Sequence, residues 1–300
     1  MTTPTTPLLS VDQLTVEFRQ HRHSAARVVH GVSFDVTDGA FVGIVGESGS
    51  GKSVTARTVA GILAPNGVAT GSVRYRGQER IGLPSKRAQR RREGIAMIFQ
   101  NPRRALDPVF TVGNQLVETL RTHDRSLTKQ QAVERAADLL AAVGIPDPRR
   151  RLRDHPHTMS GGMAQRVAIA LALACSPDLL IADEPTSALD VSVQAQILDL
   201  LLGLRRDRGT ALVFISHDLG AVAELCDDIV VMSGGQIVET GPAHQVISSP
   251  THPYTRSLLN AVPRLRGTPL PADELPFAGP ATREPLPGQP QPSDQARVSR

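Results

Sequence analysis

The sequence predicts an α/β fold whose central sheet is parallel and covered on both faces. Three short and almost continuous apolar runs support this prediction: Phe41–Val45, Leu179–Asp183 and Ala211–Ser216. A strand buried on both faces has no solvent-facing side, so its sequence is apolar throughout instead of alternating. Helix-compatible stretches lie between these runs, and strands that alternate with helices are typical of parallel sheets.

The composition agrees with a globular α/β chain. Of the 300 residues, 40% are apolar and only 3% are aromatic, with no Trp, so the core must be mostly aliphatic. No apolar run reaches the roughly 18 residues that a membrane-spanning helix needs. The start, MTTPTTPLLS, lacks the basic and apolar regions of a secretory signal. We therefore expect a soluble cytosolic protein, which would need a separate membrane subunit to serve a membrane process.

Alternating and helical patterns define the other expected elements. Leu14–Phe18 and Val32–Val36 alternate between apolar and polar residues, which predicts half-exposed strands near the start of the chain. A helix is expected from Lys52 to about Leu63, directly after the first apolar run. Near the end, Ile229–Met232 and Gln236–Thr240 flank Ser-Gly-Gly and predict a hairpin.

The middle of the chain has helical rather than strand patterns. Thr128 and Gln131 have the spacing of a capping box at the start of a helix over Thr128–Val143, and Gly144 ends it. One face of this helix, which we expect to be buried, carries Val133, Ala136, Leu140 and Val143. These features predict a helical insertion within the α/β domain.

The chain changes character after Arg264. Eight prolines lie between Pro269 and Pro292, among polar residues. A segment of this composition cannot bury enough apolar surface to offset the entropy lost on folding. We therefore expect a disordered or extended tail.

Cysteine usage is sparse. The two cysteines, Cys175 and Cys226, lie among apolar residues. Two are too few for a disulfide framework or a zinc site. Buried free thiols are the expected state, because Cys often serves as a small core residue.

The strongest chemical signal is GESGSGKS, which follows the first apolar run and opens the expected helix. It fits the pattern G-x-x-x-x-G-K-[ST], in which backbone N–H groups surround phosphate oxygens at the positive end of a helix. Lys52 would reach the β- and γ-phosphates, and Ser53 would ligate Mg²⁺. The predicted nucleotide contacts are Gly46, Glu47, Ser48, Gly49, Ser50, Gly51, Lys52 and Ser53.

Two other positions favour phosphate chemistry, although each also has an ordinary structural explanation. At the end of a buried strand, Asp183 would hold Mg²⁺ and Glu184 would polarise the water that attacks the γ-phosphate. Paired acids at a strand end are also common as capping residues. Ser160–Gly162 precedes an apolar helix and offers an anion a helix N-terminus. On its own, Ser-Gly-Gly is more typical of a loop without a ligand.

Positive charge is gathered in two clusters. The chain carries a net charge of +4, and the clusters lie at Lys86–Arg92 and Arg149–Arg153. A solvated surface is the simplest explanation. Alternatively, the clusters contact lipid headgroups or nucleic acid.

Together, these motifs resemble those of the ATP-binding cassette (ABC) ATPases over nearly everything from Leu8 to about Thr240. The ordered motifs are the loop at Gly46, Gln100, the Ser-Gly-Gly signature at Ser160, the acids Asp183–Glu184, the segment Ser187–Asp190, and His217. The resemblance implies a P-loop NTPase (RecA-like) core at 8–103 and 161–247, with an N-terminal antiparallel β subdomain. It also implies an inserted α-helical subdomain at 104–160 and a C-terminal extension and tail at 248–300.

The resemblance further implies a role for each motif residue. Catalysis would fall to Glu184, His217, Gln100 and Lys52, and Mg²⁺ would be held by Ser53, Gln100 and Asp183. Ser160, Gly161 and Gly162 would bind the γ-phosphate of ATP held by an opposite subunit, and Asp190 would cross the dimer interface. Phe18 stands where the family often places an aromatic under adenine, although a Phe in a strand is also typical of a core.

A narrower resemblance is to the oligopeptide/dipeptide importer ATPases, a family that also serves nickel and some oligosaccharides. It rests on Met97–Pro108, Asp190–Leu201 and Ser248–Leu265, the last containing Ser-Pro-x-His-Pro-Tyr-Thr. It implies an ATP-hydrolysing subunit that pairs with a second ATPase subunit, in a homo- or heterodimer. Two integral-membrane permease subunits and an extracytoplasmic solute-binding protein would complete the importer. The chain would be peripheral, on the cytoplasmic face of the cell membrane.

Two alternative functions remain at this point. One is a soluble ABC ATPase that acts on nucleic acid or ribosomes, and the other is a nucleotide-binding regulator without hydrolysis. We expect no nucleic-acid partner, because the chain has a single cassette, no long coiled-coil arm and no zinc ligands. Some relatives hold an iron–sulfur cluster in the C-terminal region, but no Cys follows Cys226, so we expect none.

Overall fold

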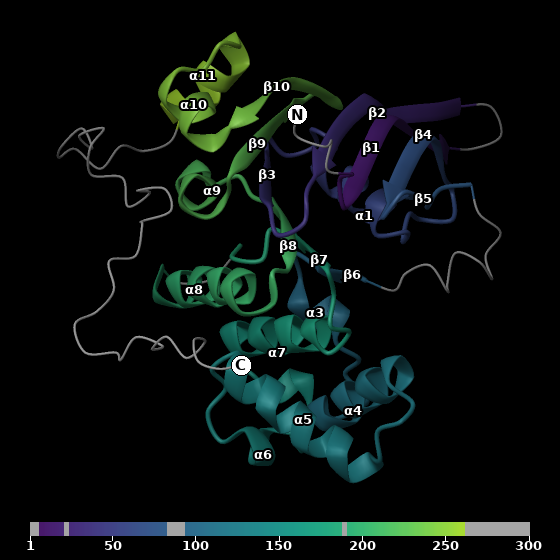
Figure 1. Cartoon of the computed structure of the whole chain (residues 1–300), viewed down its shortest axis with the longest axis vertical. Helices are drawn as coiled ribbons and strands as arrows, with labels where there is room; N and C mark the ends of the chain where they lie inside the picture. The colour runs from purple at the N-terminus through teal and green to yellow at the C-terminus, as the bar shows by residue number, and fades with distance from the viewer. Residues whose placement is uncertain (1–5, 21–23, 83–93, 188–190, 262–300) are drawn as a thin grey trace, which may run out of the picture. The chain divides into compact units, whose positions relative to one another are not determined.

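A computed structural model of the chain describes residues 6–20, 24–82, 94–187 and 191–261. These ranges contain two β-sheets and the helices that cover them (Figure 1). The predicted tail after Arg264, the basic cluster at Lys86–Arg92 and Asp190 lie outside the described residues. Within the described ranges, no helix is long and apolar enough to span a membrane.

The larger sheet has six strands in the order β10-β9-β3-β8-β7-β6. They are β3 (Phe41–Val45), β6 (Ile95–Ile98), β7 (Leu179–Asp183), β8 (Ala211–Ile215), β9 (Asp228–Ser233) and β10 (Gln236–Pro242). Neighbouring strands pair in parallel, except that β10 and β9 form an antiparallel hairpin. The predicted α/β fold and the predicted hairpin are confirmed.

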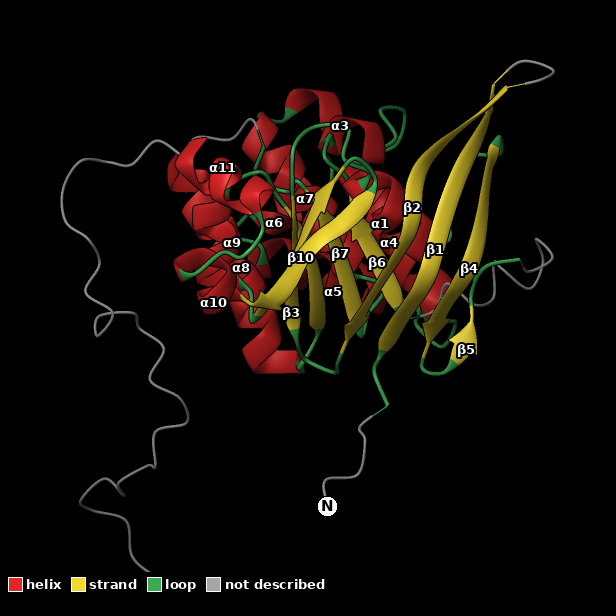
Figure 2. Cartoon of the chain, turned by 90° about the horizontal axis from the view of Figure 1, so that it is seen from above, coloured by secondary structure: helices red, strands yellow, loops and turns green. Residues whose placement is uncertain are grey.

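Both faces of this sheet are buried. In β7, Leu180 and Ala182 belong to one hydrophobic core, while Leu179 and Ile181 belong to the other. Most helices pack on the first side, and the second sheet lies on the other (Figure 2). A strand enclosed in this way needs apolar residues at every position. This explains why β3, β7 and β8 are continuous apolar runs in the sequence.

The second sheet is antiparallel, with the order β2-β1-β4-β5. It contains β1 (Leu9–Gln20), β2 (Ser24–Val36), β4 (Gly67–Tyr75) and β5 (Gln78–Glu79). The first two strands are longer than alternation predicted. Between Val11 and Glu17 the register of β1 against β2 shifts repeatedly. In β1 the buried positions change at the first shift from Leu9 and Val11 to Leu14 and Val16, so regular alternation survives only over short stretches.

The helix after the first parallel strand is α1 (Lys52–Val59), which packs between the sheets against β1, β2 and β7. It ends at Val59, earlier than the predicted end at about Leu63. Ala60 closes the last turn by donating its N–H to the Ala56 carbonyl, and Gly61 leaves the helix with a φ of 71°.

The insertion between β6 and β7 is helical, as predicted. Its helices are α3 (Pro102–Ala105), α4 (Val112–His123), α5 (Lys129–Ala142), α6 (Pro148–Arg151), a 3₁₀ turn (Pro156–Thr158) and α7 (Gly161–Leu173). The last of these, α7, packs against α3, α4 and α5 and also against β6. Because α7 contacts both parts, the domain boundary at residues 160 and 161 stays a prediction.

The capping box of α5 forms as expected between Thr128 and Gln131. On the predicted buried face, however, Val133 is 36% exposed. The prediction was wrong there because the buried stripe runs through Ala132, Ala136 and Leu140, at every fourth residue. Val133 lies beside that stripe.

The remaining helices follow the later strands. They are α8 (Val191–Arg208), α9 (Leu219–Leu225), α10 (Ala243–Ser248) and α11 (Pro253–Ala261). α9 packs on β3 and α10, and α10 also packs on β9 and β10. The segment after β10 is therefore joined to the central sheet through α10.

Candidate active site

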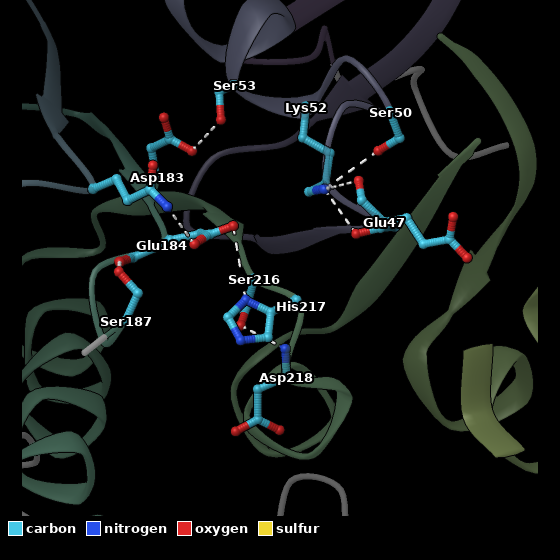
Figure 3. A network of polar contacts seen from close by, with 12 residues as sticks. Glu47, Ser50, Lys52, Ser53, Asp183, Glu184, Ser187, Ser216, His217 and Asp218 are labelled. Atoms are coloured by element: carbon cyan, nitrogen blue, oxygen red, sulfur yellow. Dashed lines mark hydrogen bonds and ion pairs between the residues drawn. The ribbon is translucent and has the colours of Figure 1, made fainter. Parts of the chain in front are cut away.

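The carboxyl ends of four parallel strands gather the predicted site residues at one edge of the central sheet. β3 leads into the loop Gly46–Ser53, β7 ends at Asp183, and Gln100 and His217 follow β6 and β8. Because parallel strands end at a common edge, residues far apart in sequence meet there. Figure 3 shows the side chains of this edge.

Lys52 is folded back onto its own loop. Its Nζ donates hydrogen bonds to the Gly46 and Glu47 carbonyls, at 2.7 Å each, and to Ser50 Oγ at 3.3 Å (Figure 3). Burial lowers the pKa of this ammonium, and the charges of Glu184, Asp183 and Glu47 oppose the change. The loop thus holds its cation close to the backbone, where phosphate oxygens would bind.

Two glycines allow the close approach of the loop to the rest of the protein. Gly46 has a φ of 148°, and a Cβ there would lie 2.1 Å from the Met232 carbonyl oxygen. Gly51, with a φ of 96°, is the N-cap of α1, so the first N–H groups of the helix open toward the loop. Only glycine suits these backbone positions.

The donors around Asp183 fit a magnesium ion. Asp183 is fully buried, and its Oδ1 accepts a 2.8 Å hydrogen bond from Ser53 Oγ. Its Oδ2 is buried with no hydrogen-bond partner, and Arg57 Nη2 stands 3.9 Å away. Burial raises the pKa of this carboxyl, whereas Ser53 and Arg57 lower it. Among the described residues no three His, Cys, Asp or Glu side chains form a metal cluster. Mg²⁺ in ATPase sites is normally held by one or two side chains together with phosphate oxygens.

Glu184 contacts two other predicted catalytic side chains of this edge. Gln100 Nε2 donates to Glu184 Oε2 at 2.7 Å, and His217 Nδ1 lies 3.7 Å from Glu184 Oε1. Glu184 has a left-handed φ of 48°, which non-glycine residues rarely adopt and which is found preferentially at functional sites. The structure therefore brings Gln100, Glu184 and His217 together as the sequence suggested.

Several supporting contacts were missed by the sequence analysis. The Glu184 carbonyl accepts hydrogen bonds from the N–H and the hydroxyl of Ser187. The two neighbours of His217 in the sequence are also held in place. Asp218 donates its N–H to Ser216 Oγ, and its side chain caps α9. The Asp that precedes an apolar helical segment was a usable cap signal. No local pattern marks the last of these contacts, in which the Glu47 N–H donates to the Tyr254 hydroxyl at 2.9 Å.

The Ser-Gly-Gly turn lies at the N-terminus of α7. Ser160 is the N-cap and accepts a hydrogen bond from the Met163 N–H, and both Ser160 and Gly161 are exposed. In Figure 1 this helix lies with α4 and α5, while α1 and its loop lie beside the antiparallel sheet. The turn therefore has an exposed helix end, but its predicted phosphate contact stays a prediction.

Two other predicted nucleotide contacts also stay predictions. Phe18 is half-buried in β1 and packs against the core between the sheets. Asp190 lies outside the described residues. The structure therefore leaves both the adenine contact and the interface contact as expectations.

The described basic cluster is partly neutralised within the chain. Arg149 forms an ion pair with Glu134, and Arg151 forms one with Asp154 at 2.8 Å. This arrangement agrees with the surface explanation for the cluster.

Comparisons with known proteins agree with these motifs. Residues 29–187 match the family described as ABC transporter, and residues 238–289 match the C-terminal region of oligopeptide/dipeptide transporters. The dipeptide transport ATP-binding protein DppD of Escherichia coli is 49% identical, over 85% of this chain and 78% of that protein. The oligopeptide transport ATP-binding protein OppD of Haemophilus influenzae is 47% identical, over 87% and 80%. Nothing in these matches supports the nucleic-acid alternative.

A solved structure agrees as well. A dimeric, post-hydrolysis form of the ATP-binding cassette MJ0796, bound to ADP and phosphate, aligns with a TM-score of 0.71 at 26% identity. The alignment covers 78% of this chain and 98% of that one. The predicted family is thus confirmed by sequence and by fold. The chain belongs to the ABC transporter ATPases and, by its C-terminal region, to their oligopeptide/dipeptide branch.

Proposed function

We propose that the chain binds MgATP at the carboxyl edge of the central sheet and hydrolyses it to drive import of oligopeptides or dipeptides. The observation that carries this proposal is the meeting of the phosphate loop, the Ser53–Asp183 pair and the Gln100–Glu184–His217 group at that edge. Each part alone has a structural explanation. Their convergence at one edge is what phosphate-transfer chemistry requires.

Each side chain has a definite task in the proposed reaction. Glu184 accepts a hydrogen bond from the attacking water and orients it toward the γ-phosphorus. The water oxygen bonds to phosphorus and its proton leaves through the Glu184 carboxylate, while the bond between the γ-phosphorus and the bridging oxygen breaks to give ADP and phosphate. Gln100 holds the Glu184 carboxylate, and His217 would donate to a γ-phosphate oxygen. Lys52 would stabilise the growing negative charge on the phosphates. Bound Mg²⁺, held by Ser53, Asp183 and Gln100, would neutralise phosphate charge.

The active form would contain two ATPase subunits. The N-terminus of α7, capped by the exposed Ser160, could accept an anion, and the similar cassette MJ0796 is dimeric. In a head-to-tail pair each Ser160–Gly162 turn would contact the γ-phosphate held by the partner's phosphate loop. ATP would join the two chains, and hydrolysis would release them.

The partners would be two permease subunits in the membrane, together with an extracytoplasmic solute-binding protein. An exposed apolar pair between α3 and α4 supports a docking surface for a permease, because Val109 is 72% exposed and Phe110 51%. The pair lies in the same segment as Gln100, which donates to Glu184, so docking of a permease would act on the Glu184 site through Gln100. The chain would then be peripheral, on the cytoplasmic face of the membrane.

Replacing Glu184 tests the proposal most directly. Glu184→Gln keeps the shape of the side chain but removes the carboxylate, so steady-state ATP hydrolysis should fall on the order of a hundredfold or more. ATP binding should persist, and ATP should trap a dimer detectable by light scattering. Glu118→Gln, on the exposed face of α4, is the matched control and should behave as the wild type. Undiminished hydrolysis in the Glu184 variant would refute the assigned role.

A further inference from the structure

The His-Pro-Tyr-Thr sequence beyond the ATPase core has no task in the proposed mechanism. It lies at the start of α11, where Pro253 is the first residue. The N–H that proline lacks would have no partner within the helix at this position, so no hydrogen bond is lost. The Tyr254 N–H donates to His252 Nδ1 at 3.1 Å. The segment therefore builds a fixed turn before its helix, which sets the direction of the Tyr254 side chain.

This turn is fastened to the central sheet by one carboxylate. Glu239, in β10, accepts hydrogen bonds from the Thr251 N–H, the Thr251 hydroxyl and the His252 N–H, at 2.7, 2.8 and 3.1 Å. Burial would raise the pKa of Glu239, but the nearby Thr255 hydroxyl and the bonds from Thr251 and His252 lower it to about 2. The carboxylate is therefore ionised, and its bonds are of the stronger, charge-assisted kind.

From this anchored turn, Tyr254 reaches the phosphate loop. Its hydroxyl accepts the Glu47 N–H at 2.9 Å, across 207 residues of sequence. That N–H belongs to the same peptide unit as the Gly46 carbonyl, which accepts the Lys52 ammonium at 2.7 Å. One peptide unit is thus held at both ends, by Lys52 on its oxygen and by Tyr254 on its nitrogen.

The held peptide is also the least tolerant part of the loop. Gly46 has a φ of 148° that few other residues adopt, and its backbone passes close to the Met232 carbonyl. Without a partner at Glu47, a rotation of this peptide would turn the Gly46 carbonyl away from Lys52. The loop would then have to be reordered each time a nucleotide binds, and that ordering lowers affinity.

We propose that Tyr254 is a positioning residue for ATP binding, through which the C-terminal segment holds the phosphate loop in its binding-ready shape. The proposal rests on the proposed function, because it assumes that this loop binds ATP. Tyr254 also packs, half-buried, against the core. A purely structural role would therefore predict lost stability without a selective change in nucleotide affinity.

The test separates the Tyr254 hydroxyl from its ring. Tyr254→Phe should raise the Kd and KM for MgATP about two- to tenfold, the worth of one hydrogen bond, while kcat stays within twofold of the wild type. Tyr75→Phe is the matched control, since Tyr75 is the only other tyrosine and bonds Asp178 away from the loop. It should lower the unfolding temperature but leave the Kd for MgATP unchanged.

A second variant tests the path through Glu239. Glu239→Gln should also raise the Kd for MgATP. The double variant with Tyr254→Phe should have a Kd no higher than that of the single variant with the higher Kd, because both substitutions remove the same constraint. An unchanged Kd in Tyr254→Phe, a parallel fall in kcat, or additive effects in the double variant would each overturn the proposal. If the wild type binds MgATP without hydrolysing it, only the proposed function fails, because the Kd comparison still decides the role of Tyr254. If the wild type binds no nucleotide, both fail.

Discussion

Gln100 donates a 2.7 Å hydrogen bond from its side-chain amide to the carboxylate of Glu184, although 84 residues separate them. The contact follows from topology, because Gln100 comes just after β6 and Glu184 just after β7, and these strands are parallel neighbours. Gln100 also lies two residues before α3, the first helix of the insertion. A movement of the insertion relative to the sheet would therefore displace Gln100, the donor that holds the water-orienting carboxylate of Glu184.

The first prediction concerns this contact. Gln100→Ala frees the Glu184 carboxylate from its donor, so kcat for ATP should fall on the order of ten- to a hundredfold, as is usual when a supporting partner is lost. KM should change less than kcat, because the phosphate loop and the Ser53–Asp183 pair would still hold MgATP after Gln100 is lost. Gln130→Ala, on the exposed start of α5, is the control. A wild-type kcat in the Gln100 variant would show that the hydrogen bond has no part in turnover.

Local chemistry made much of the fold predictable. The strands β3 and β7 have the bounds that their apolar runs gave, because both of their faces are buried. The Thr128–Gln131 capping box is likewise a short-range interaction, and it formed as expected. The loop Gly46–Ser53 was predictable because its glycines, Lys52 and Ser53 all act within one short segment, so their spacing in the sequence defines the site.

Features that depend on distant partners were not predictable. The full length of β1 was hidden by its register shifts against β2, which depend on the partner strand. Val133 is exposed because α4 and α7, which lie elsewhere in the sequence, pack on the stripe of Ala132, Ala136 and Leu140. The Glu47–Tyr254 contact joins segments 207 residues apart. The fold decides such a pairing, so the His-Pro-Tyr-Thr sequence could identify a family but not this contact.

The second prediction tests the divided nucleotide site. In a Glu184→Gln background, Ser160→Arg should abolish the ATP-dependent dimer, because a bulky side chain would stand where the partner's γ-phosphate must lie. Each chain should still bind ATP. Light scattering after size-exclusion chromatography would measure the mass with and without MgATP.

The control for the Ser160 variant must lose a helix cap as well. Thr128→Arg does so, since the exposed Thr128 caps α5 with its side chain as Ser160 caps α7, at a similar cost of about 1 kcal/mol. This variant should still dimerise. An ATP-dependent dimer that survives Ser160→Arg would argue against a signature turn in the interface.

The third prediction addresses the permease surface. The double variant Val109→Ser, Phe110→Ser removes an exposed apolar pair, so co-purification with the permease subunits expressed alongside it should be lost. ATP hydrolysis by the isolated chain should be unchanged, because neither side chain belongs to the active-site edge. Val68→Ser removes an exposed valine from β4, at 39% exposure, and should leave the assembly intact. Equal losses in both variants would mean that the effect is not specific to this surface.

The last prediction uses pH. Burial raises the pKa of the Cys226 thiol, and the neighbouring Asp227 carboxylate adds to the change. Since the folded pKa is above the unfolded value of about 8.5, the unfolded chain releases its proton first as pH rises. The contribution of this thiol to the free energy of unfolding is therefore greatest below pH 8.5. It declines at higher pH, by up to about 1.4 kcal/mol per pH unit.

Urea unfolding between pH 8 and pH 10 would measure this decline. Cys226→Ala removes the titrating group, so its free energy of unfolding should fall less steeply with pH than that of the wild type. Cys175→Ala is the comparison, because Cys175 is only half-buried and its pKa is also raised by burial. It should flatten the dependence less than Cys226→Ala does. Parallel pH curves for the wild type and Cys226→Ala would show that the thiol ionises equally well in the folded and unfolded states, against the burial seen here.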